Sequence, residues 1–390
     1  MPDFPHVALI IETSKQYGRE LLLGIGRYLQ AHGPWSVFLD EREESDREPR
    51  WLDDWDGDGI ITRSADPSGS RLARQRGIPA VNLSYHRDLD PDLPMPCINC
   101  DHPRTGAMVA EYFARRGFRR FAYCHVRGAT WSEDRRDAFI AAAQKAGGTA
   151  EVFDASPRSE RRGAHWEREQ DQLAAWVQSL PKPCGIMAAY DVLGARVIDA
   201  CRRVGVRVPE SVAIVGVDND PLFCSVSWPP LSSVDQNVQR IGFEAARLLA
   251  AMMKGEAPGA GREPILIPPK ELVTRTSSDI LAFHDSNIAA ALQFIRDHAG
   301  RPITVDEVAR RAGLSRRELE RRFQRLLETS PYKEIQRARI KRVRNLLIHT
   351  DDTLESISET LGFSEAANMA NLFKKEMGMP PGEYRKSRGN

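Results

Sequence analysis

Charged side chains follow several of the strands predicted in the first 276 residues of this 390-residue chain. They lie in Glu12–Arg19, Asp101, Arg127–Arg135, Asp191 and Asp218–Asp220. Ligands of open α/β sheets bind beyond the carboxyl ends of the strands. There, carboxylates accept hydrogen bonds from adjacent hydroxyl groups, and arginine donates to the same oxygens. These residues therefore predict a binding site for a neutral polyol or sugar.

Aromatic residues in the same segments fit this interpretation. Tyr17 and Trp131 could cover the C–H face of a sugar ring. A plainer alternative is that the acidic residues only cap helices, and Asp101 and Asp191 each stand where a helix is predicted to begin. Both interpretations remain open at this stage.

A second set of polar residues near the C-terminus has the spacing of a DNA-reading helix. Leu319, Phe323 and Leu326 recur at i, i+4 and i+7, which predicts a buried stripe. The residues that face away from this stripe are Arg316, Arg317, Glu320, Arg321 and Gln324. Arginine matches guanine O6/N7 or a phosphate, and glutamate can accept from cytosine N4.

A second helix of the same kind follows about 50 residues later. Met369 and Phe373 are predicted to point inward. The residues expected at or near a DNA groove are Glu365, Ala366, Ala367, Asn368 and Asn371. Phosphate contacts are expected from Lys374 and Lys375, and from Arg339, Lys341, Arg342 and Arg344 between the two helices. The alternative is a solvated basic helix pair that serves only solubility.

The elements that must position these residues change type along the chain. From His6 to about Ser278, short apolar runs alternate with helical stretches, as in parallel sheets covered by helices. Their length predicts two doubly wound lobes. We therefore expect a sensor domain over residues 1–276, a linker over 277–286 and an all-helical domain over 287–390.

The helical domain contains an internal repeat that predicts two helix-turn-helix motifs, at about 304–326 and 353–376. Each copy has an apolar pair, a Gly for the turn and a Ser that can cap the next helix. Thr304 and Glu307 form a predicted capping box. The helix from Pro331 to about Ile348 would span roughly 27 Å, so the reading helices could lie about one DNA turn, ~34 Å, apart.

Composition supports this division and excludes several classes. Residues 285–390 carry 20 Lys and Arg against 15 Asp and Glu, whereas the remainder has 35 against 39. A basic tail on a slightly acidic body suggests that the tail meets a polyanion. No signal peptide or apolar run of membrane-spanning length is present, and the mean hydropathy is -0.44. We expect a cytoplasmic protein that does not enter the membrane.

Motifs for catalysis or metal binding are missing from the sequence. Cys97 and Cys100 form a CxxC without a second pair, so packing cysteines are expected. There is no phosphate-binding Gly-x-x-x-x-Gly-Lys loop, no Gly-x-Ser-x-Gly elbow and no His-Glu-x-x-His. We therefore predict no enzyme, no metal and no cofactor.

The tail resembles the AraC/XylS-type DNA-binding domain over residues 287–387. The motifs that carry the resemblance are Ala309-x-x-Ala312-Gly313-Leu314-Ser315, Gly362-Phe363-Ser364 and Phe373-Lys374-Lys375-x-x-Gly378-x-Pro380-Pro381-x-x-Tyr384-Arg385. The resemblance implies that the first reading helix contacts bases through Arg317, Glu320 and Arg321. For the second reading helix it implies Ala366, Ala367, Ala370 and Asn371. Asn371 stands where the family has Arg, which predicts weaker base reading by the second motif.

Residues 6–276 resemble the ligand-binding domain of LacI/GalR-type repressors, which is a two-lobed, type I periplasmic-binding-protein-like fold. The motifs are Asp58-Gly59-Ile60-Ile61, Arg135-x-x-Ala138-Phe139, Ala189-Tyr190-Asp191 and Val215-Gly216-Val217-Asp218-Asn219-Asp220. A sensor of this kind before an AraC-type tail resembles the xylose operon regulator family. The resemblance implies effector contacts at Tyr17, Arg19, Arg135, Asp191 and Asp218.

The same resemblance implies D-xylose as the effector, operator DNA as a partner and a homodimer. It also implies activation of pentose catabolic genes, with RNA polymerase as a further partner. The alternatives are another sugar, a purine or an amino acid as effector, a solute-binding protein for transport, or a sugar-metabolising enzyme such as a kinase.

Overall fold

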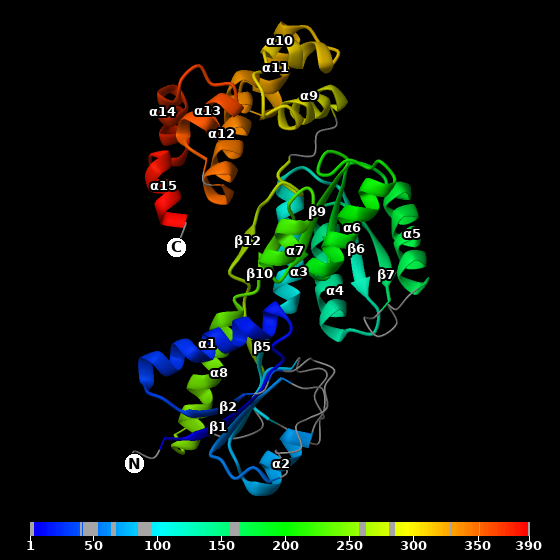
Figure 1. Ribbon diagram of the computed structural model, residues 1–390. Coiled ribbons are helices and arrows are strands. Elements are labelled where there is room, and N and C mark those ends of the chain that lie inside the picture. The colour runs from blue at the N-terminus through cyan, green and yellow to red at the C-terminus, as the bar shows by residue number, and fades with distance from the viewer. Residues whose placement is uncertain are drawn as a thin grey trace. The chain divides into compact units, whose positions relative to one another are not determined.

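The fold was obtained as a computed structural model, shown in Figure 1. It describes residues 4–39, 41, 54–63, 68–84, 95–156, 164–256, 263–280, 285–327, 329–350 and 352–388. The chain forms two compact units, Met1–Ala282 and Phe283–Asn390. Among the described residues, every helix is too short or too polar to cross a lipid bilayer.

The first unit begins with a lobe built on a parallel sheet of order β2-β1-β3-β4. Its strands are β1 (His6–Ile10), β2 (Ser36–Leu39), β3 (Gly59–Thr62) and β4 (Ala80–Asn82). A parallel pair, β5 (Ile98–Cys100) and β11 (Ile265–Ile267), adjoins β4 through the Asn82–Cys97 bridge. The helices are α1 (Gln16–His32), α2 (Ser68–Arg76) and α8 (Val238–Met253). Strands β1, β3 and β4 are buried along most of their length, as expected for a sheet covered on both faces. The edge strand β2 is exposed.

The second lobe contains a six-stranded sheet of order β12-β10-β9-β8-β6-β7, in which only β12 is antiparallel to its neighbour. Its strands are β6 (Arg120–Val126), β7 (Thr149–Ala155), β8 (Cys184–Ala188), β9 (Val212–Val217), β10 (Ser232–Asp235) and β12 (Glu271–Val273). The helices are α3 (His102–Arg115), α4 (Thr130–Lys145), α5 (Ala164–Ser179), α6 (Asp191–Arg203) and α7 (Pro221–Val226). Each lobe has its own apolar core.

The chain crosses between the lobes three times, after β5, after β10 and after β11. This is the two-lobed architecture that the alternating pattern and the resemblance predicted, and that prediction is confirmed. Because both sheets are mainly parallel, the segments after their strands gather where the lobes meet. The fold thus brings together residues that are far apart in the sequence.

The second unit is entirely helical among its described residues. Its helices are α9 (Ser286–Asp297), α10 (Val305–Arg311), α11 (Arg316–Leu327), α12 (Pro331–His349), α13 (Leu354–Thr360), α14 (Ala366–Met377) and α15 (Pro381–Arg388). One core lies under α10 and α11, and another under α13 and α14. The two predicted helix-turn-helix motifs, the connecting helix α12 and the Thr304–Glu307 capping box are all present. Gly313 and Gly362, in the two turns, have φ of 66° and 65°, a conformation that favours glycine.

The start of the predicted linker packs on the second lobe instead. Ser277 and Ser278 are fully buried and Ile280 is 7% exposed. Ser277 Oγ donates to the Ile214 carbonyl, and Tyr112 Oη donates to the Ser278 carbonyl. The sequence signal at this point was only the end of the strand pattern, which carries no information on these hydrogen bonds.

Close packing of α1 on α8 depends on glycine (Figure 1). A Cβ at Gly24 would lie 2.0 Å from the Gln239 carbonyl oxygen, and one at Gly242 would lie 2.0 Å from that of Leu21. We expect Gly24→Ala to cost about 1–3 kcal/mol in unfolding free energy because the helices must separate. The measurement is urea denaturation of the full chain.

Gly26 provides a matched control on the same helix, since nothing lies within 4 Å of a Cβ placed there. Gly26→Ala should stabilise the protein by about 0.5–1 kcal/mol through helix propensity. Similar effects of the two substitutions would show that α1 and α8 are not in close contact.

Candidate functional site

Arg135 of α4 is the buried centre of the residues that meet between the lobes. Its side chain donates from Nη1 to the Ala189 carbonyl at 2.5 Å and from Nε to His102 Nδ1 at 3.2 Å. Its guanidinium carbon lies 4.8 Å from the ring centre of Trp131. Only 3% of Arg135 is exposed. The predicted pair Trp131 and Arg135 therefore forms one stacked unit, with Tyr190 edge-on to Trp131.

Asp218 follows β9, and its negative charge interacts with Arg135. Burial raises the pKa of its carboxyl group above the ordinary value, while the charges of Arg135, Arg63 and Lys15 lower it. Asp218 and Asn219 have φ of 100° and 51°. Such values are uncommon for residues other than glycine and mark a constrained turn. Among the described residues, burial and nearby charges, rather than hydrogen bonds, act on the Asp218 carboxylate.

The first lobe contributes Tyr17, at the start of α1. Its hydroxyl lies 3.2 Å from Cys100 Sγ, and the Arg63 guanidinium carbon lies 4.6 Å from its ring centre. Burial, followed by the nearby Cys100, raises the pKa of Tyr17 well above its usual value. Arg63 in turn pairs with Glu12, whose Oε2 is buried without a hydrogen-bond partner in the described structure.

Asp191 has a role within the second lobe. Its Oδ1 accepts from Ser233 Oγ at 2.6 Å, and its Oδ2 accepts from the Asp220 backbone N–H at 2.7 Å. It is 2% exposed. Burial, followed by the charge of Asp218, raises the pKa of Asp191 well above the ordinary value. Asp191 therefore holds the Asp218–Asp220 turn in place, and its two oxygens are already engaged.

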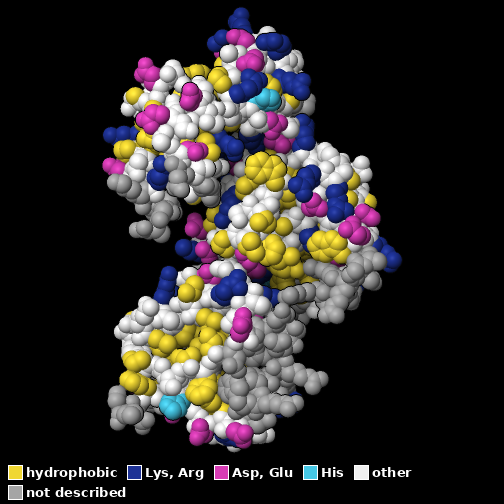
Figure 2. Space-filling model, viewed as in Figure 1, with side chains coloured by type: hydrophobic (Ala, Val, Ile, Leu, Met, Phe, Trp, Pro, Cys, Tyr) yellow, Lys and Arg dark blue, Asp and Glu magenta, His cyan; other side chains and the backbone are white. Residues whose placement is uncertain are grey.

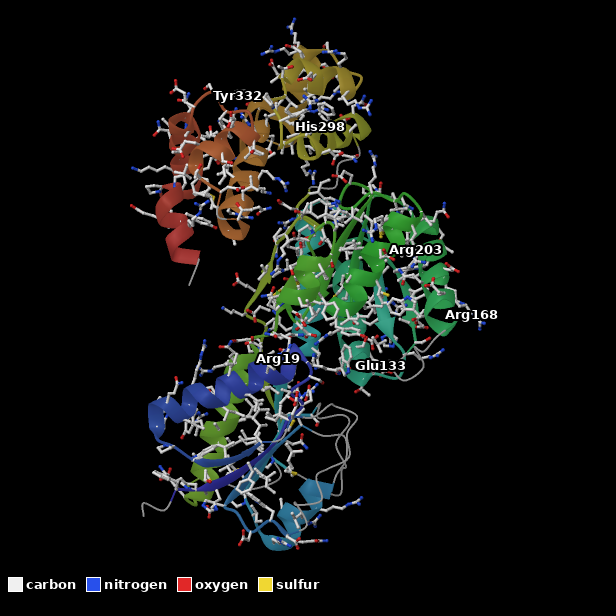
Figure 3. The ribbon with its side chains drawn as sticks, in the orientation of Figure 1. Arg19, Glu133, Arg168, Arg203, His298 and Tyr332 are labelled. Atoms are coloured by element: carbon white, nitrogen blue, oxygen red, sulfur yellow. The ribbon has the colours of Figure 1, made fainter. Side chains whose placement is uncertain are left out.

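The other two predicted residues lie at the border of this cluster. Asp101 caps α3 by accepting from the Arg104 backbone N–H at 2.8 Å, which is the alternative that the sequence left open. Arg19 is exposed near the start of α1 and donates to the Thr13 carbonyl at 2.8 Å (Figure 3). Among the described residues, the hydrogen bonds of these two side chains go to partners other than Arg135 and Asp218.

Sequence reasoning missed three polar residues at the junction. Arg63 directly follows β3, and the rule that selects residues after strands would have found it. His102 is the acceptor for Arg135 Nε. Gln236 lies after β10, fully buried, with Oε1 bound to Thr105 Oγ1 and Nε2 without a partner among the described residues. No three His, Cys, Asp or Glu side chains in the described part of the chain are arranged to hold a metal ion.

In the second unit, the predicted face of α11 is exposed. Leu319 and Phe323 are fully buried. The exposed residues are Arg316, Arg317, Glu320, Arg321 and Gln324. Figure 2 shows Lys and Arg side chains over the α9–α11 part of this unit. Arg316 pairs with Glu320 and Asp306, and Arg321 pairs with Glu318, whereas Arg317 makes no ion pair with a described residue.

The face of α14 agrees with its prediction in the same way. Met369 and Phe373 are fully buried. Ala366 is half-buried, and Ala367, Asn368, Asn371, Lys374 and Lys375 are exposed. Asn368 Nδ2 donates to Ser364 Oγ at 2.9 Å.

Arg339, one of the predicted phosphate contacts, also packs within the second unit. Its Nη2 donates to the Leu361 carbonyl at the end of α13, and its guanidinium carbon lies 3.7 Å from the Phe363 ring centre. Burial lowers the pKa of Arg339. The residue thus joins the connecting helix to the second turn motif, a contact that the charge pattern could not reveal.

Three family models match the chain. An XylR N-terminal domain matches residues 6–101, a periplasmic binding protein-like domain matches 110–278, and a helix-turn-helix domain matches 308–387. The matches agree with the two-lobed first unit and the helical second unit.

Relatives match over nearly the whole length. The xylose operon regulatory protein of Haemophilus influenzae is 32% identical, covering 97% of this chain and 97% of the relative. The protein of the same name from Escherichia coli K12 is 30% identical, covering 97% and 96%. A solved structure described as xylose-binding transcription activator XylR covers 99% of both chains, with 28% identity and a TM-score of 0.78.

The environment of Asp191 predicts a pH effect on stability. Because its pKa is raised in the folded protein, the folded state holds this proton to higher pH than the unfolded chain does. The contribution of protonated Asp191 to the unfolding free energy is present at low pH. It is lost as pH rises through the pKa that Asp191 has in the folded protein. Denaturation at a series of pH values should therefore show Asp191→Asn gaining stability relative to the native chain as pH rises.

Asp199 supplies a control of opposite sign. It is partly buried, but hydrogen bonds from Arg202 and Arg203 outweigh burial and lower its pKa. Asp199→Asn should lose stability relative to the native chain as pH rises through that lowered pKa, by a small amount because the pairs are exposed. Parallel pH profiles for the native chain and Asp191→Asn would contradict the assignment.

Proposed function

The chain belongs to the xylose operon regulatory protein family, and we propose that it activates pentose catabolic genes in response to D-xylose. Members of the family are sugar-sensing, DNA-binding transcription regulators. The observation that carries the proposal is one chain with a two-lobed sensor, a polar cluster between its lobes and two exposed helix-turn-helix faces. It would act in the cytoplasm on operator DNA, without catalysis and without a cofactor.

The cluster around Arg135 supports a sugar as effector. Asp218 can accept from ligand hydroxyl groups, and Arg135 and Arg63 can donate to their oxygens. The faces of Trp131 and Tyr17 can cover apolar ring carbons. The printed names of the relatives support D-xylose among the sugars. A purine could use the same charges and stack on the same two aromatic rings, so a titration must compare purines with the sugars.

Effector binding would act on the DNA-binding unit by favouring one arrangement of the two lobes. A ligand shifts such an equilibrium only through its different affinities for the two states. The contacts from both lobes, Arg63 and Tyr17 on one side and Arg135 and Asp218 on the other, provide that difference. We further propose that the active form is a homodimer that recruits RNA polymerase.

D-xylose should raise the melting temperature of the full chain, and Asp218→Asn should remove this shift. At about 100 times the dissociation constant, the ligand adds roughly 2.7 kcal/mol of stability. The measurement is a thermal-shift titration against D-xylose, L-arabinose, D-ribose, D-glucose and purines. If only a purine raised the melting temperature, or if none of the sugars raised it, the proposed effector would be contradicted.

Two substitutions test the DNA-reading face. Arg321→Ala should cost ~1–3 kcal/mol on specific DNA and relax specificity at one position. Lys374→Ala should weaken binding to all sequences alike and reduce the salt dependence, because it removes a phosphate contact. Binding is measured on specific and random duplexes over a range of salt concentrations. If both variants lost the same DNA affinity on the specific and on the random duplex, the assignment of the reading helix would be wrong.

A further inference from the structure

The carboxylate of Glu318 binds one side of the Arg321 guanidinium, and both residues lie on α11. Arg321 Nε and Nη2 donate to Glu318 Oε2 and Oε1, each at 2.8 Å. Other ion pairs between described residues of this unit have one contact, such as Arg316 Nε to Glu320 at 3.0 Å and Arg337 Nη1 to Glu334 at 2.6 Å. Two parallel hydrogen bonds fix the plane of a guanidinium as well as its position.

This arrangement leaves the outer edge of the guanidinium available. A guanidinium has five N–H donors, and Glu318 takes the one on Nε and one on Nη2. Three donors remain, and two of them, one on Nη1 and one on Nη2, lie along the outer edge. Guanine presents two acceptors, N7 and O6, in the major groove, and they match such an edge. Arg321 is 60% exposed, so this edge can reach a partner.

Glu318 is itself held from several sides. Its backbone N–H donates to Ser315 Oγ at 3.2 Å in the first turn of α11. Its Oε1 also accepts from Arg322 Nε at 2.6 Å, and Arg322 Nη1 donates to Asp285 Oδ2 at 2.9 Å. Asp285 caps α9, so this chain of contacts is anchored in a second helix. Hydrogen bonds from Arg321 and Arg322 lower the pKa of Glu318 to about 2, so its carboxylate is ionised at neutral pH.

We propose that Glu318 is a positioning residue for base recognition, which holds Arg321 so that its outer edge reads guanine. The inference rests on the proposed DNA-reading function of α11. Glu318 does not touch the base itself. It raises specificity because the guanidinium is ordered before DNA binds, and less rotamer freedom is lost on binding.

The test is selection of bound sequences from a pool of randomised DNA duplexes by the full chain with D-xylose. Four proteins are compared: the native chain, Arg321→Ala, Glu318→Gln and the double variant. The position at which Arg321→Ala loses a guanine preference identifies the base read by Arg321. Glu318→Gln should reduce the preference at that position by roughly five- to tenfold and leave the other positions unchanged. The double variant should match Arg321→Ala, because Glu318 acts through Arg321.

Glu334→Gln is the matched control, since it removes one negative charge and one arginine pair on α12. It should keep the full guanine preference, and thermal melting checks that each variant is folded. The positioning role would be overturned if Glu318→Gln kept the full guanine preference at that position, or if the double variant lost more preference than Arg321→Ala. Either result would leave the proposed DNA-reading function standing. If the native chain enriched no sequence, the proposed DNA-reading function would be overturned, and the inference with it.

Discussion

Arg135 places a positive charge in the interior of the sensor unit with 3% of its surface exposed. A buried charge is costly unless it is paired and hydrogen-bonded. The Arg135 guanidinium donates hydrogen bonds to the Ala189 carbonyl and to His102 Nδ1, and it packs on the face of Trp131. Asp218, on a turn of positive φ, adds the opposing charge. Gly106 lets α3 approach α4 here, because a Cβ there would lie 2.1 Å from the Arg135 carbonyl oxygen. In the proposed site, a ligand hydroxyl that donates to Asp218 would stabilise the carboxylate beside Arg135.

The part of the candidate site that follows directly after predicted strands could be predicted from the sequence. Trp131, Arg135 and Asp218 follow strands of one sheet, and the structure brings them together. The pattern could not tell which carboxylates are already engaged. Asp191 and Asp101 look like Asp218 in the sequence, but their oxygens accept from Ser233, Asp220 and Arg104. Those contacts depend on loop conformation, which residue spacing does not determine.

The DNA-binding unit was more predictable, because its signals are local. Helix periodicity, a turn glycine and a capping box each act within a few residues, so α10, α11, α13 and α14 lie where expected. The exposed faces of α11 and α14 follow directly from that periodicity. Contacts between helices were not accessible in this way. Arg339 resembles any other basic residue of α12 in the sequence, yet it packs on Phe363.

The proposed coupling between the sensor and the DNA-binding unit would join these observations into one function. Near the end of the sensor, Ser277, Ser278 and Ile280 are buried in its second lobe. Asp285 caps the first helix of the helical unit and contacts Arg322 of the reading helix. The most direct measurement is the affinity of the full chain for its selected DNA duplex, with and without D-xylose, at fixed salt. A coupled protein should show a change of roughly 5- to 150-fold, and DNA should change the affinity for D-xylose by the same factor. Equal DNA affinities in the two conditions, at saturating D-xylose, would contradict the coupling.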